Sequence, residues 1–263
     1  MEVEKGERFE FGANWLHFLG ALDEQRIDSA ADSLSGMLDL ANLQGMRFLD
    51  IGSGSGLFSL AARRMGAEVR SFDYDPQSVA CALEMKRRYC PDDPAWRVEQ
   101  GSVLDKAYLD SLGRFDVVYS WGVLHHSGKM WQAMDNISSL VEEGGLLFIA
   151  IYNDQGWRSR YWRGVKRLYN LNAPLKCLVT VLHLPLYIGR VILRSLKGRM
   201  REVRGMSLWH DYIDWLGGYP FETASSRQVL DFFSRKGYAL VKLKDVGGRS
   251  GCNEFVFRLG RGV

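Results

Sequence analysis

The run Phe48-Leu49-Asp50-Ile51-Gly52-Ser53-Gly54-Ser55-Gly56-Leu57 joins a short apolar stretch to three alternating glycines, and a helical pattern follows it. Glycine lets the backbone approach a ligand closely and adopt positive φ angles. A strand, a glycine-rich turn and a helix in this order form the place where open α/β sheets bind nucleotides. Because Gly-x-Gly spacing also occurs in ordinary turns, the loop needs support from the rest of the chain.

The residues around the loop have the pattern of a parallel sheet with crossover helices. Short apolar runs predict strands at 47–51, 68–73, 96–100, 115–120 and 146–152. Helical spacing of apolar residues falls between them, at 57–65, 78–89, 106–112 and 129–141. Near the carboxyl terminus, the sequence predicts a helix at 226–236 and a strand pair at 240–246 and 254–259, joined by a glycine-rich turn. The fold class is therefore α/β, with a hairpin that finishes the sheet.

Two further segments lie outside this alternation. The amino-terminal segment is rich in aromatic residues and includes a helical stretch at 27–40. The segment that follows residue 152 is rich in Trp, Tyr, Arg and Leu. We expect four parts: an amino-terminal helical extension (1–45), a nucleotide-binding core (46–152), a lid or substrate-binding insertion (153–222), and a helix and hairpin that complete the core sheet (223–263).

Composition narrows the classes of partner. The chain has 263 residues, 46% hydrophobic and 25% charged, with a net charge of +3. This is globular composition without the basic excess of a protein that binds nucleic-acid phosphates, so a nucleic-acid partner is not expected. Four scattered cysteines suggest neither a zinc site nor a disulfide framework, and the charged amino terminus has no secretory pattern. We expect a cytoplasmic protein, and the sequence leaves its oligomeric state open.

An acidic residue stands where a ribose-binding group belongs. Asp73 ends the second predicted strand, 21 residues after Gly52, and its carboxylate can accept hydrogen bonds from a ribose diol. Tyr74 beside it can cover an adenine face. Ser102 and Val103 follow the third predicted strand, where a backbone amide and a side-chain acceptor can bind an adenine edge.

Four motifs in order carry a family resemblance. Residues 50–56, Phe72-Asp73, 101–105 and 115–126 resemble successive motifs of class I S-adenosylmethionine-dependent methyltransferases. The resemblance covers residues 46–152 and implies a Rossmann-like sheet of seven strands, mostly parallel, whose last strand runs antiparallel in a terminal hairpin. It also implies S-adenosyl-L-methionine as cofactor. The predicted cofactor residues are Asp50, Gly52, Ser53, Gly54, Gly56, Asp73, Tyr74, Ser102, Val103, Ser120 and Trp121.

The rival cofactor is a nicotinamide dinucleotide. Its fingerprint, Gly-x-Gly-x-x-Gly, uses a helix amino terminus to hold a pyrophosphate. Here the glycines are Gly52, Gly54 and Gly56, and Leu57 takes the place of the third fingerprint glycine. The spacing and the later motifs favour methyl transfer.

A pair of histidines follows the fourth predicted strand. His125 and His126 lie at the carboxyl edge of the sheet, where the cofactor's methyl group should point, and histidine is a natural base near neutral pH. We expect one of them to be the general base of an O-methyltransferase, while at least one only packs or binds a loop.

Other polar and aromatic residues are predicted to bind the methyl acceptor. They occupy the loop after the fifth predicted strand and the cluster before the last helix: Tyr152, Asn153, Trp157, Arg160, Asp211, Trp215, Tyr219 and Glu222. Together with Phe11-Gly12-Ala13-Asn14-Trp15 and Cys252-Asn253-Glu254, this arrangement resembles small-molecule methyltransferases that act on quinones, sugars or natural products. No spacing suggests a metal site. A core or local hydrogen-bonding role remains open for these residues.

Two alternatives to an O-methyltransferase stay open. Carbon, nitrogen or carboxyl acceptors would use the same cofactor fold, and a non-methylating relative could keep the cofactor pocket.

The stretch 175–193 is apolar, but Lys176, His183, Pro185 and Arg190 interrupt it, and we expect it to fall short of a membrane span. Its basic amphipathic character fits either a lid helix or contact with a membrane surface or a lipid-linked substrate.

Overall fold

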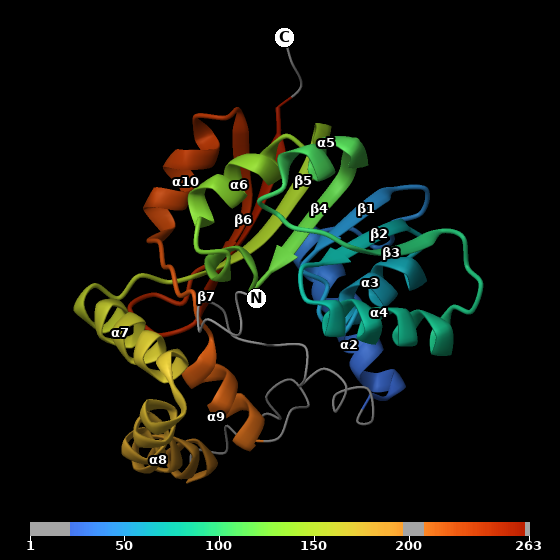
Figure 1. The fold of residues 1–263 in the computed structure, drawn as a ribbon. Helices are drawn as coiled ribbons and strands as arrows, with labels where there is room; N and C mark the ends of the chain where they lie inside the picture. The colour runs from blue at the N-terminus through green and yellow to red at the C-terminus, as the bar shows by residue number, and fades with distance from the viewer. Residues whose placement is uncertain (1–21, 197–207, 261–263) are drawn as a thin grey trace.

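The computed structural model describes residues 22–196 and 208–260, and one sheet organises them (Figure 1). Its seven strands lie in the order β3-β2-β1-β4-β5-β7-β6. They are β1 (Arg47–Ile51), β2 (Glu68–Asp73), β3 (Trp96–Gln100), β4 (Phe115–Trp121), β5 (Val141–Tyr152), β6 (Tyr238–Lys244) and β7 (Cys252–Leu259). The first five pair in parallel, and β7 is antiparallel to both β5 and β6. The predicted fold class, including the antiparallel terminal hairpin, is confirmed.

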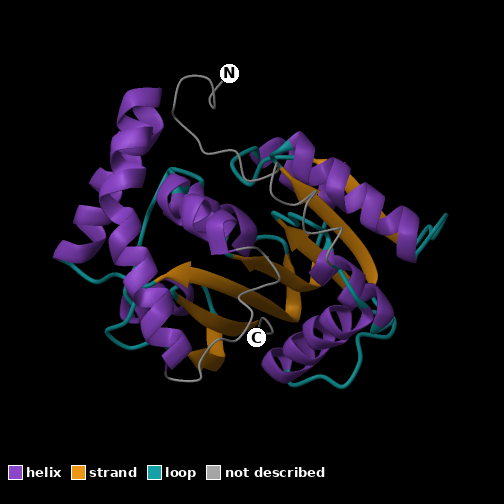
Figure 2. Cartoon of the chain, turned by 90° about the horizontal axis from the view of Figure 1, so that it is seen from below, coloured by secondary structure: helices purple, strands orange, loops and turns teal. Residues whose placement is uncertain are grey.

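Helices cover both faces of the sheet (Figures 1 and 2). One face carries α2 (Glu24–Leu38), α3 (Leu57–Arg64) and α4 (Pro76–Tyr89); the other carries α5 (Lys106–Leu112), α6 (Met130–Ser138) and α10 (Ser226–Ser234). Each layer has its own buried cluster against the strands. Burial on both faces explains why β1 and β4 are nearly continuous apolar runs.

The predicted boundary between the helix at 129–141 and the fifth strand is wrong. The helix ends at Ser138, and β5 begins at Val141, five residues before the predicted start at 146. Val141 is part of the strand because it pairs with Phe115 of β4. A side chain at Gly145 would come within 2.9 Å of the Asp116 carbonyl oxygen, so glycine permits this close strand approach.

Three helices, α7 (Trp157–Leu171), α8 (Ala173–Leu196) and α9 (Leu208–Gly217), form a separate group beside the sheet (Figure 1). They share a small buried cluster of their own, which includes Val165, Tyr169, Val179, Tyr212 and Leu216. We call this group the α7–α9 unit. It follows directly from β5 and leads back to α10.

Helix α8 is more apolar than its interruptions suggested. The stretch Ala173–Leu193 has a mean hydropathy of 1.5 and is long and apolar enough to cross a membrane. Only 12% of it is buried within the protein. Lys176, His183, Pro185 and Arg190 therefore do not take its composition below that of a membrane-crossing helix.

Some sequence-based expectations lie outside the described residues. These are the aromatic amino-terminal residues, including Phe11, Asn14 and Trp15, and the basic positions Lys197, Arg199, Arg201 and Arg204. The side chains of Arg190, Arg194, Asp211 and Asp214 are outside the description as well.

Candidate active site

The glycine loop between β1 and α3 has the backbone geometry that its sequence predicted. Gly52, Gly54 and Gly56 all have positive φ angles, of 73°, 52° and 82°. A β-carbon on Gly52 would lie 2.4 Å from a methyl group of Val123, and one on Gly56 would lie 3.1 Å from Ala82. The first glycine therefore brings the loop close to the turn after β4, and the third lets α3 pack on α4.

Asp73 ties the end of β2 to this loop. One carboxylate oxygen accepts a hydrogen bond from the Gly54 amide at 2.9 Å, and the other accepts from the Asp75 amide at 2.9 Å. An ionised carboxylate has about four acceptor sites, so a group held in this way can accept hydrogen bonds from more than one donor. The group is thus held in place by backbone donors beside the loop.

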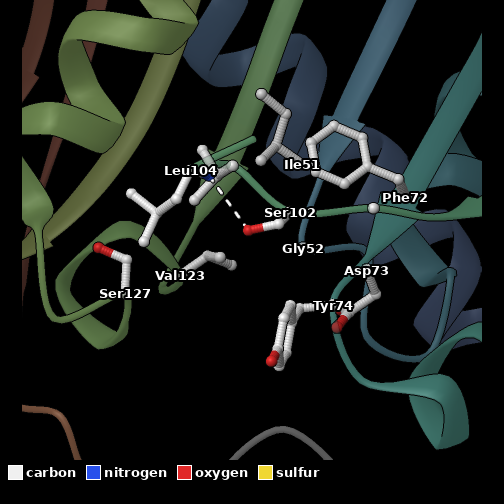
Figure 3. Close-up of a pocket in the computed structure, with 11 residues that line it drawn as sticks. Ile51, Gly52, Phe72, Asp73, Tyr74, Ser102, Leu104, Val123 and Ser127 are labelled. Carbon is white, nitrogen blue, oxygen red and sulfur yellow. Dashed lines mark hydrogen bonds between the residues drawn. The ribbon is translucent and has the colours of Figure 1, made fainter. Parts of the chain in front are cut away.

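A pocket opens between this carboxylate and the turn after β4 (Figure 3). It encloses about 380 Å³ of empty space, part of it open to solvent. Figure 3 shows Asp73 and Tyr74 on one side of it, Val123 and Ser127 on the other, and Ser102 between them. The lining residues are Ile51, Gly52, Phe72, Asp73, Tyr74, Gly101, Ser102, Val103, Leu104, Val123 and Ser127.

The structure brings five predicted cofactor residues into this lining: Gly52, Asp73, Tyr74, Ser102 and Val103. Ser102 accepts a hydrogen bond from the Leu104 amide at 3.2 Å, which shapes the loop after β3. The pocket thus combines a carboxylate, a hydroxyl, an aromatic ring and aliphatic walls. These are the groups that a ribose and a flat base require.

The other predicted cofactor residues do not line the pocket. Ser120 donates to the Ile51 carbonyl at 3.1 Å and joins β4 to β1, while Trp121 packs on the cluster under α2, α3 and α4. Ser53 places its hydroxyl oxygen in a buried position that has no hydrogen-bond partner among the described residues. A buried hydroxyl in this state favours a ligand that supplies a polar atom.

Asp50 lies beneath the glycine loop and is 2% exposed. It accepts a hydrogen bond from the Ser59 hydroxyl at 2.6 Å. Burial raises the pKa of Asp50, hydrogen bonds from Ser59 lower it, and the nearby Asp73 charge raises it, so that the net pKa is about 7. Two carboxyl groups therefore stand on either side of the loop, one buried and one lining the pocket.

The histidines occupy a single turn of 3-10 helix, η1 (Leu124–His126), between Val123 and Ser127. Because both flanking residues line the pocket, the pair stands at its edge. The two rings are buried, at 0% and 8% exposed, with centroids 4.5 Å apart.

Their hydrogen bonds assign them opposite tautomers. The Tyr152 amide donates to His125 Nδ1 at 3.3 Å, so the proton of a neutral His125 ring belongs on Nε2. His126 Nδ1 lies 2.6 Å from the Pro220 carbonyl oxygen, which can only accept. His126 therefore donates from Nδ1, and the lone pair of its neutral ring is on Nε2.

An aromatic cluster continues from the histidines into the α7–α9 unit. Tyr152 lies 3.9 Å from the His125 ring and 5.5 Å from the His126 ring, measured between centroids. Phe221 and Trp215 follow at 5.2 and 6.2 Å from Tyr152. The predicted residues Tyr152 and Trp215 are thus brought together with both histidines.

A buried lysine supports this cluster. Lys166 of α7 is 1% exposed and donates to the Trp215 carbonyl oxygen. Its ammonium group also lies 4.4 Å from the Trp215 ring centroid and 5.0 Å from that of Phe221. These contacts compensate part of the cost of burying a charge, and they fix the two rings relative to α7.

The remaining predicted acceptor residues are placed differently. Asn153 binds the β6–β7 turn through the Gly247 carbonyl at 2.6 Å, and Trp157 and Arg160 are exposed at the start of α7. Tyr219 is half-buried ahead of a cis bond to Pro220, and Asp211 lies on α9.

Glu222 accepts a hydrogen bond from the first amide of α6, that of Met130, at 2.9 Å. Burial raises the pKa of Glu222, and the Met130 bond and the Arg163 charge lower it. Arg163 of α7 therefore supplies positive charge near Glu222.

Sequence reasoning missed several residues of this region. Val123, Ser127 and Leu104 line the pocket, and Lys166, Pro220 and Phe221 build the aromatic cluster. Val123 and Ser127 were detectable, because they flank the histidine pair that follows β4. Lys166 and Pro220 carry no local signal, since their partners are distant in sequence.

The family follows from comparison with known proteins. A family model described as a methyltransferase domain matches residues 22–176, more than half of the chain. The chain belongs to this methyltransferase domain family. The match takes in the sheet up to β5, the glycine loop, the histidine turn and α7.

Curated relatives match over a shorter range. Ubiquinone biosynthesis O-methyltransferases of Brucella melitensis biotype 2 (strain ATCC 23457) and Sinorhizobium medicae (strain WSM419) are each 32% identical to this chain over 111 residues. That range is 42% of this chain and 43% of each relative. The chain thus spans less than half the length of the relatives it matches.

Solved structures share the fold at low identity. The magnesium protoporphyrin IX methyltransferase of Synechocystis PCC 6803, solved with bound SAH, has a TM-score of 0.53 and 14% identity over 90% of this chain and 83% of its own. A putative methyltransferase of Haloferax volcanii, in complex with the Trm112 activator, has a TM-score of 0.57 and 13% identity over 97% of each chain. The [4+2]-cyclase SpnF has a TM-score of 0.57 and 13% identity over 89% of this chain and 81% of its own.

Proposed function

We propose that this protein is an S-adenosylmethionine-dependent methyltransferase that methylates a hydroxyl group of a small molecule. One observation carries the proposal: the histidine turn lies between residues that line a pocket containing the Asp73 carboxylate, and its rings contact an aromatic cluster. Membership of the methyltransferase domain family supports the reaction class. The O-methyltransferase relatives support the hydroxyl acceptor.

The pocket fits S-adenosylmethionine in three respects. Asp73 can accept the ribose hydroxyls, and Tyr74 and Val103 can enclose the adenine. Gly52 of the glycine loop lines the pocket, so its backbone can approach the ligand closely. When bound, this cofactor supplies an electrophilic methyl group on a sulfonium sulfur.

We propose His126 as the general base. In the reaction the acceptor oxygen forms a bond to the methyl carbon while the carbon–sulfur bond breaks, and the hydroxyl proton must leave. His126 Nε2 carries the lone pair because the Pro220 carbonyl holds the Nδ1 proton. That carbonyl also stabilises the ring once it is protonated at both nitrogens. His125, turned by the Tyr152 amide, is a positioning residue.

We propose the aromatic cluster, with the 153–222 insertion that contains most of it, as the acceptor-binding part of the molecule. Tyr152, Trp215 and Phe221 offer flat apolar faces within reach of the histidines. Such faces suit a planar ring that bears a hydroxyl, such as a quinol or another aromatic natural-product intermediate. A sugar hydroxyl remains a weaker fit, since it offers less flat surface.

A methyl-transfer assay against a panel of hydroxylated acceptors tests this function. Purified protein is given S-adenosylmethionine with a labelled methyl group, and catechols, hydroquinones and sugars are screened for labelled product. We expect product with planar hydroxylated rings. With a good acceptor, His126→Ala should lower kcat by about 10²- to 10⁴-fold while leaving cofactor affinity unchanged. Equal kcat in wild type and His126→Ala would exclude His126 as the general base.

A second candidate is a relative that keeps the pocket but runs another reaction. The likeness to a [4+2]-cyclase shows that the fold alone does not determine chemistry. Carbon, nitrogen and carboxyl acceptors are also compatible with the fold. Cofactor binding without labelled product from any acceptor class would favour the non-methylating reading. Product whose formation does not depend on His126 would favour an acceptor that needs no base.

A further inference from the structure

Helix α8 exposes an apolar stripe along its whole described length. Six side chains on it are 52–64% exposed: Leu178, Val181, Leu182, Leu186, Ile192 and Leu193. Their spacing of three or four residues as far as Leu186, and of six and seven residues from there to Ile192 and Leu193, places them on one face of the helix. Exposed large apolar side chains scattered singly are normal, but a continuous stripe indicates an interaction surface.

The opposite side of α8 is already occupied. Val179 and His183 are buried, and His183 Nε2 lies at hydrogen-bond distance, 2.8 Å, from the Tyr161 hydroxyl oxygen of α7. The Tyr212 hydroxyl of α9 donates to the Thr180 carbonyl at 2.6 Å. The exposed stripe therefore faces away from α7 and α9. Figure 1 shows α8 at the end of the α7–α9 unit that is far from the sheet.

The sequence around the stripe is positively charged throughout. Residues 155–201 contain no Asp or Glu. The same segment carries these basic residues: Arg158, Arg160, Arg163, Lys166, Arg167, Lys176, Arg190, Arg194, Lys197, Arg199 and Arg201. Since the whole chain has a net charge of only +3, the positive charge is concentrated in this segment. An apolar stripe within such a segment complements an anionic lipid surface.

We propose that the α8 stripe docks the protein on the surface of an anionic lipid bilayer, with the helix lying in the plane of the interface. Leucine, valine and isoleucine side chains enter the acyl boundary, and exposed basic side chains of the segment, such as Lys176, bind lipid phosphates. A spanning orientation would carry α7 and α9, with the exposed charges Arg163 and Arg167, into the hydrocarbon region. The surface orientation keeps those charges in water or at the headgroups.

A second copy of the chain is a poorer occupant of the stripe. Two stripes packed together would bring two acid-free basic segments side by side, and like charges at an interface oppose association. A bilayer with anionic headgroups instead supplies the missing countercharge. The proposal does not depend on the methyl acceptor, because it rests on the apolar stripe of α8 and the basic segment around it.

Vesicle binding by the full chain tests the proposal. Co-sedimentation compares vesicles of phosphatidylcholine mixed with phosphatidylglycerol against vesicles of phosphatidylcholine alone. We expect retention by the anionic vesicles, much weaker retention by the neutral ones, and a decrease with added salt. Leu182→Glu and Leu186→Glu should each weaken the binding about tenfold or more, because each replaces an inserted apolar group by a charge.

The matched control is Leu83→Glu on α4, a leucine that is 47% exposed far from α8 in sequence, which should bind vesicles as wild type does. Arg167→Glu, outside the stripe, should weaken binding several-fold. Circular dichroism establishes that each variant is folded. Absence of retention by anionic vesicles would overturn the proposal. So would a dimer in solution that Leu182→Glu dissociates while vesicle binding persists, because the stripe would then be a self-association surface.

Discussion

Asp73 is the residue on which cofactor recognition depends most directly. Its two oxygens are held by the Gly54 and Asp75 amides and face the pocket beside Tyr74 (Figure 3). Asp73→Ala should weaken S-adenosylmethionine binding by about 10- to 100-fold, because hydrogen bonds to a charged acceptor contribute about 1.5–3 kcal/mol. Calorimetric titration measures this, with Asp73→Asn expected to fall between wild type and Ala. Unchanged affinity in the Ala variant would exclude the carboxylate from the ribose site.

Asp50 gives stability a defined pH dependence. Burial raises the pKa of this carboxyl group to about 7, whereas in an unfolded chain it titrates near pH 4. Between these values the folded protein keeps a proton that the unfolded chain has lost, so the free energy of unfolding falls as pH rises. The contribution is fully present below pH 4 and is lost by about pH 7.

Asp50→Asn should therefore flatten this dependence in the ligand-free protein. Relative to wild type, the variant should gain about 2–3 kcal/mol between pH 5 and pH 8. Urea unfolding at the two pH values gives the difference. Asp28→Asn, at an exposed position of α2, is the control and should show no comparable gain. A constant difference between Asp50→Asn and wild type would show that the raised pKa does not act on stability.

The β1–α3 loop and the turn after β4 meet at Gly52. A β-carbon there would collide with Val123, whereas one at Gly45, with nearly the same φ of 74°, would meet no atom within 4 Å. Gly45→Ala should cost about 1–2 kcal/mol for its backbone conformation. Gly52→Ala should cost a further 1–3 kcal/mol or so for the overlap and should weaken cofactor binding. Urea unfolding compares the two.

The double variant Gly52→Ala/Val123→Ala separates the two effects. Removing the valine methyl groups should recover part of the loss seen in Gly52→Ala. If Gly45→Ala and Gly52→Ala lower the free energy of unfolding by the same amount, the close approach of the loop to Val123 does not contribute to stability.

At the level of elements, the sequence was informative wherever function depends on the ends of successive strands. Gly52, Asp73, Ser102 and Val103 follow β1, β2 and β3, and parallel strands bring those ends to one edge of the sheet. The same rule placed the histidine pair after β4.

Long-range contacts could not be predicted in this way. Glu222 binds the first amide of α6, 92 residues earlier in the chain, and Pro220 orients His126 across 94 residues. Nothing in the local sequence of 219–222 distinguishes these roles from substrate binding. The start of β5 was likewise missed, because Val141, which fitted the helical spacing, instead pairs with Phe115 of β4.

On the scale of the whole molecule, the α7–α9 unit has its own core. Its buried cluster is distinct from the two clusters that hold helices on the sheet. We expect the unit to open without unfolding the sheet, as regions with separate contacts do.

Two tyrosine-to-phenylalanine variants test this division. Tyr212 donates to the Thr180 carbonyl within the α7–α9 unit, and Tyr238 donates to the Ser138 carbonyl in the main core, both at 2.6 Å. Loss of either bond costs about 1 kcal/mol, or roughly fivefold in an opening equilibrium. Tyr212→Phe should speed amide exchange in α8 and α9 alone, and Tyr238→Phe should speed it in β4 and β5. Equal acceleration throughout by Tyr212→Phe would show a single cooperative unit.

The central claim, that the pocket at the carboxyl edge of the sheet binds S-adenosylmethionine, is tested most directly by calorimetric titration of the full chain. The ligands are S-adenosylmethionine, S-adenosylhomocysteine and NAD. The account predicts that both adenosyl ligands bind at about micromolar affinity and that NAD does not, since the loop has no cradle for a pyrophosphate. Binding of NAD alone would contradict the account, and binding of none of the three would leave the pocket without its proposed cofactor.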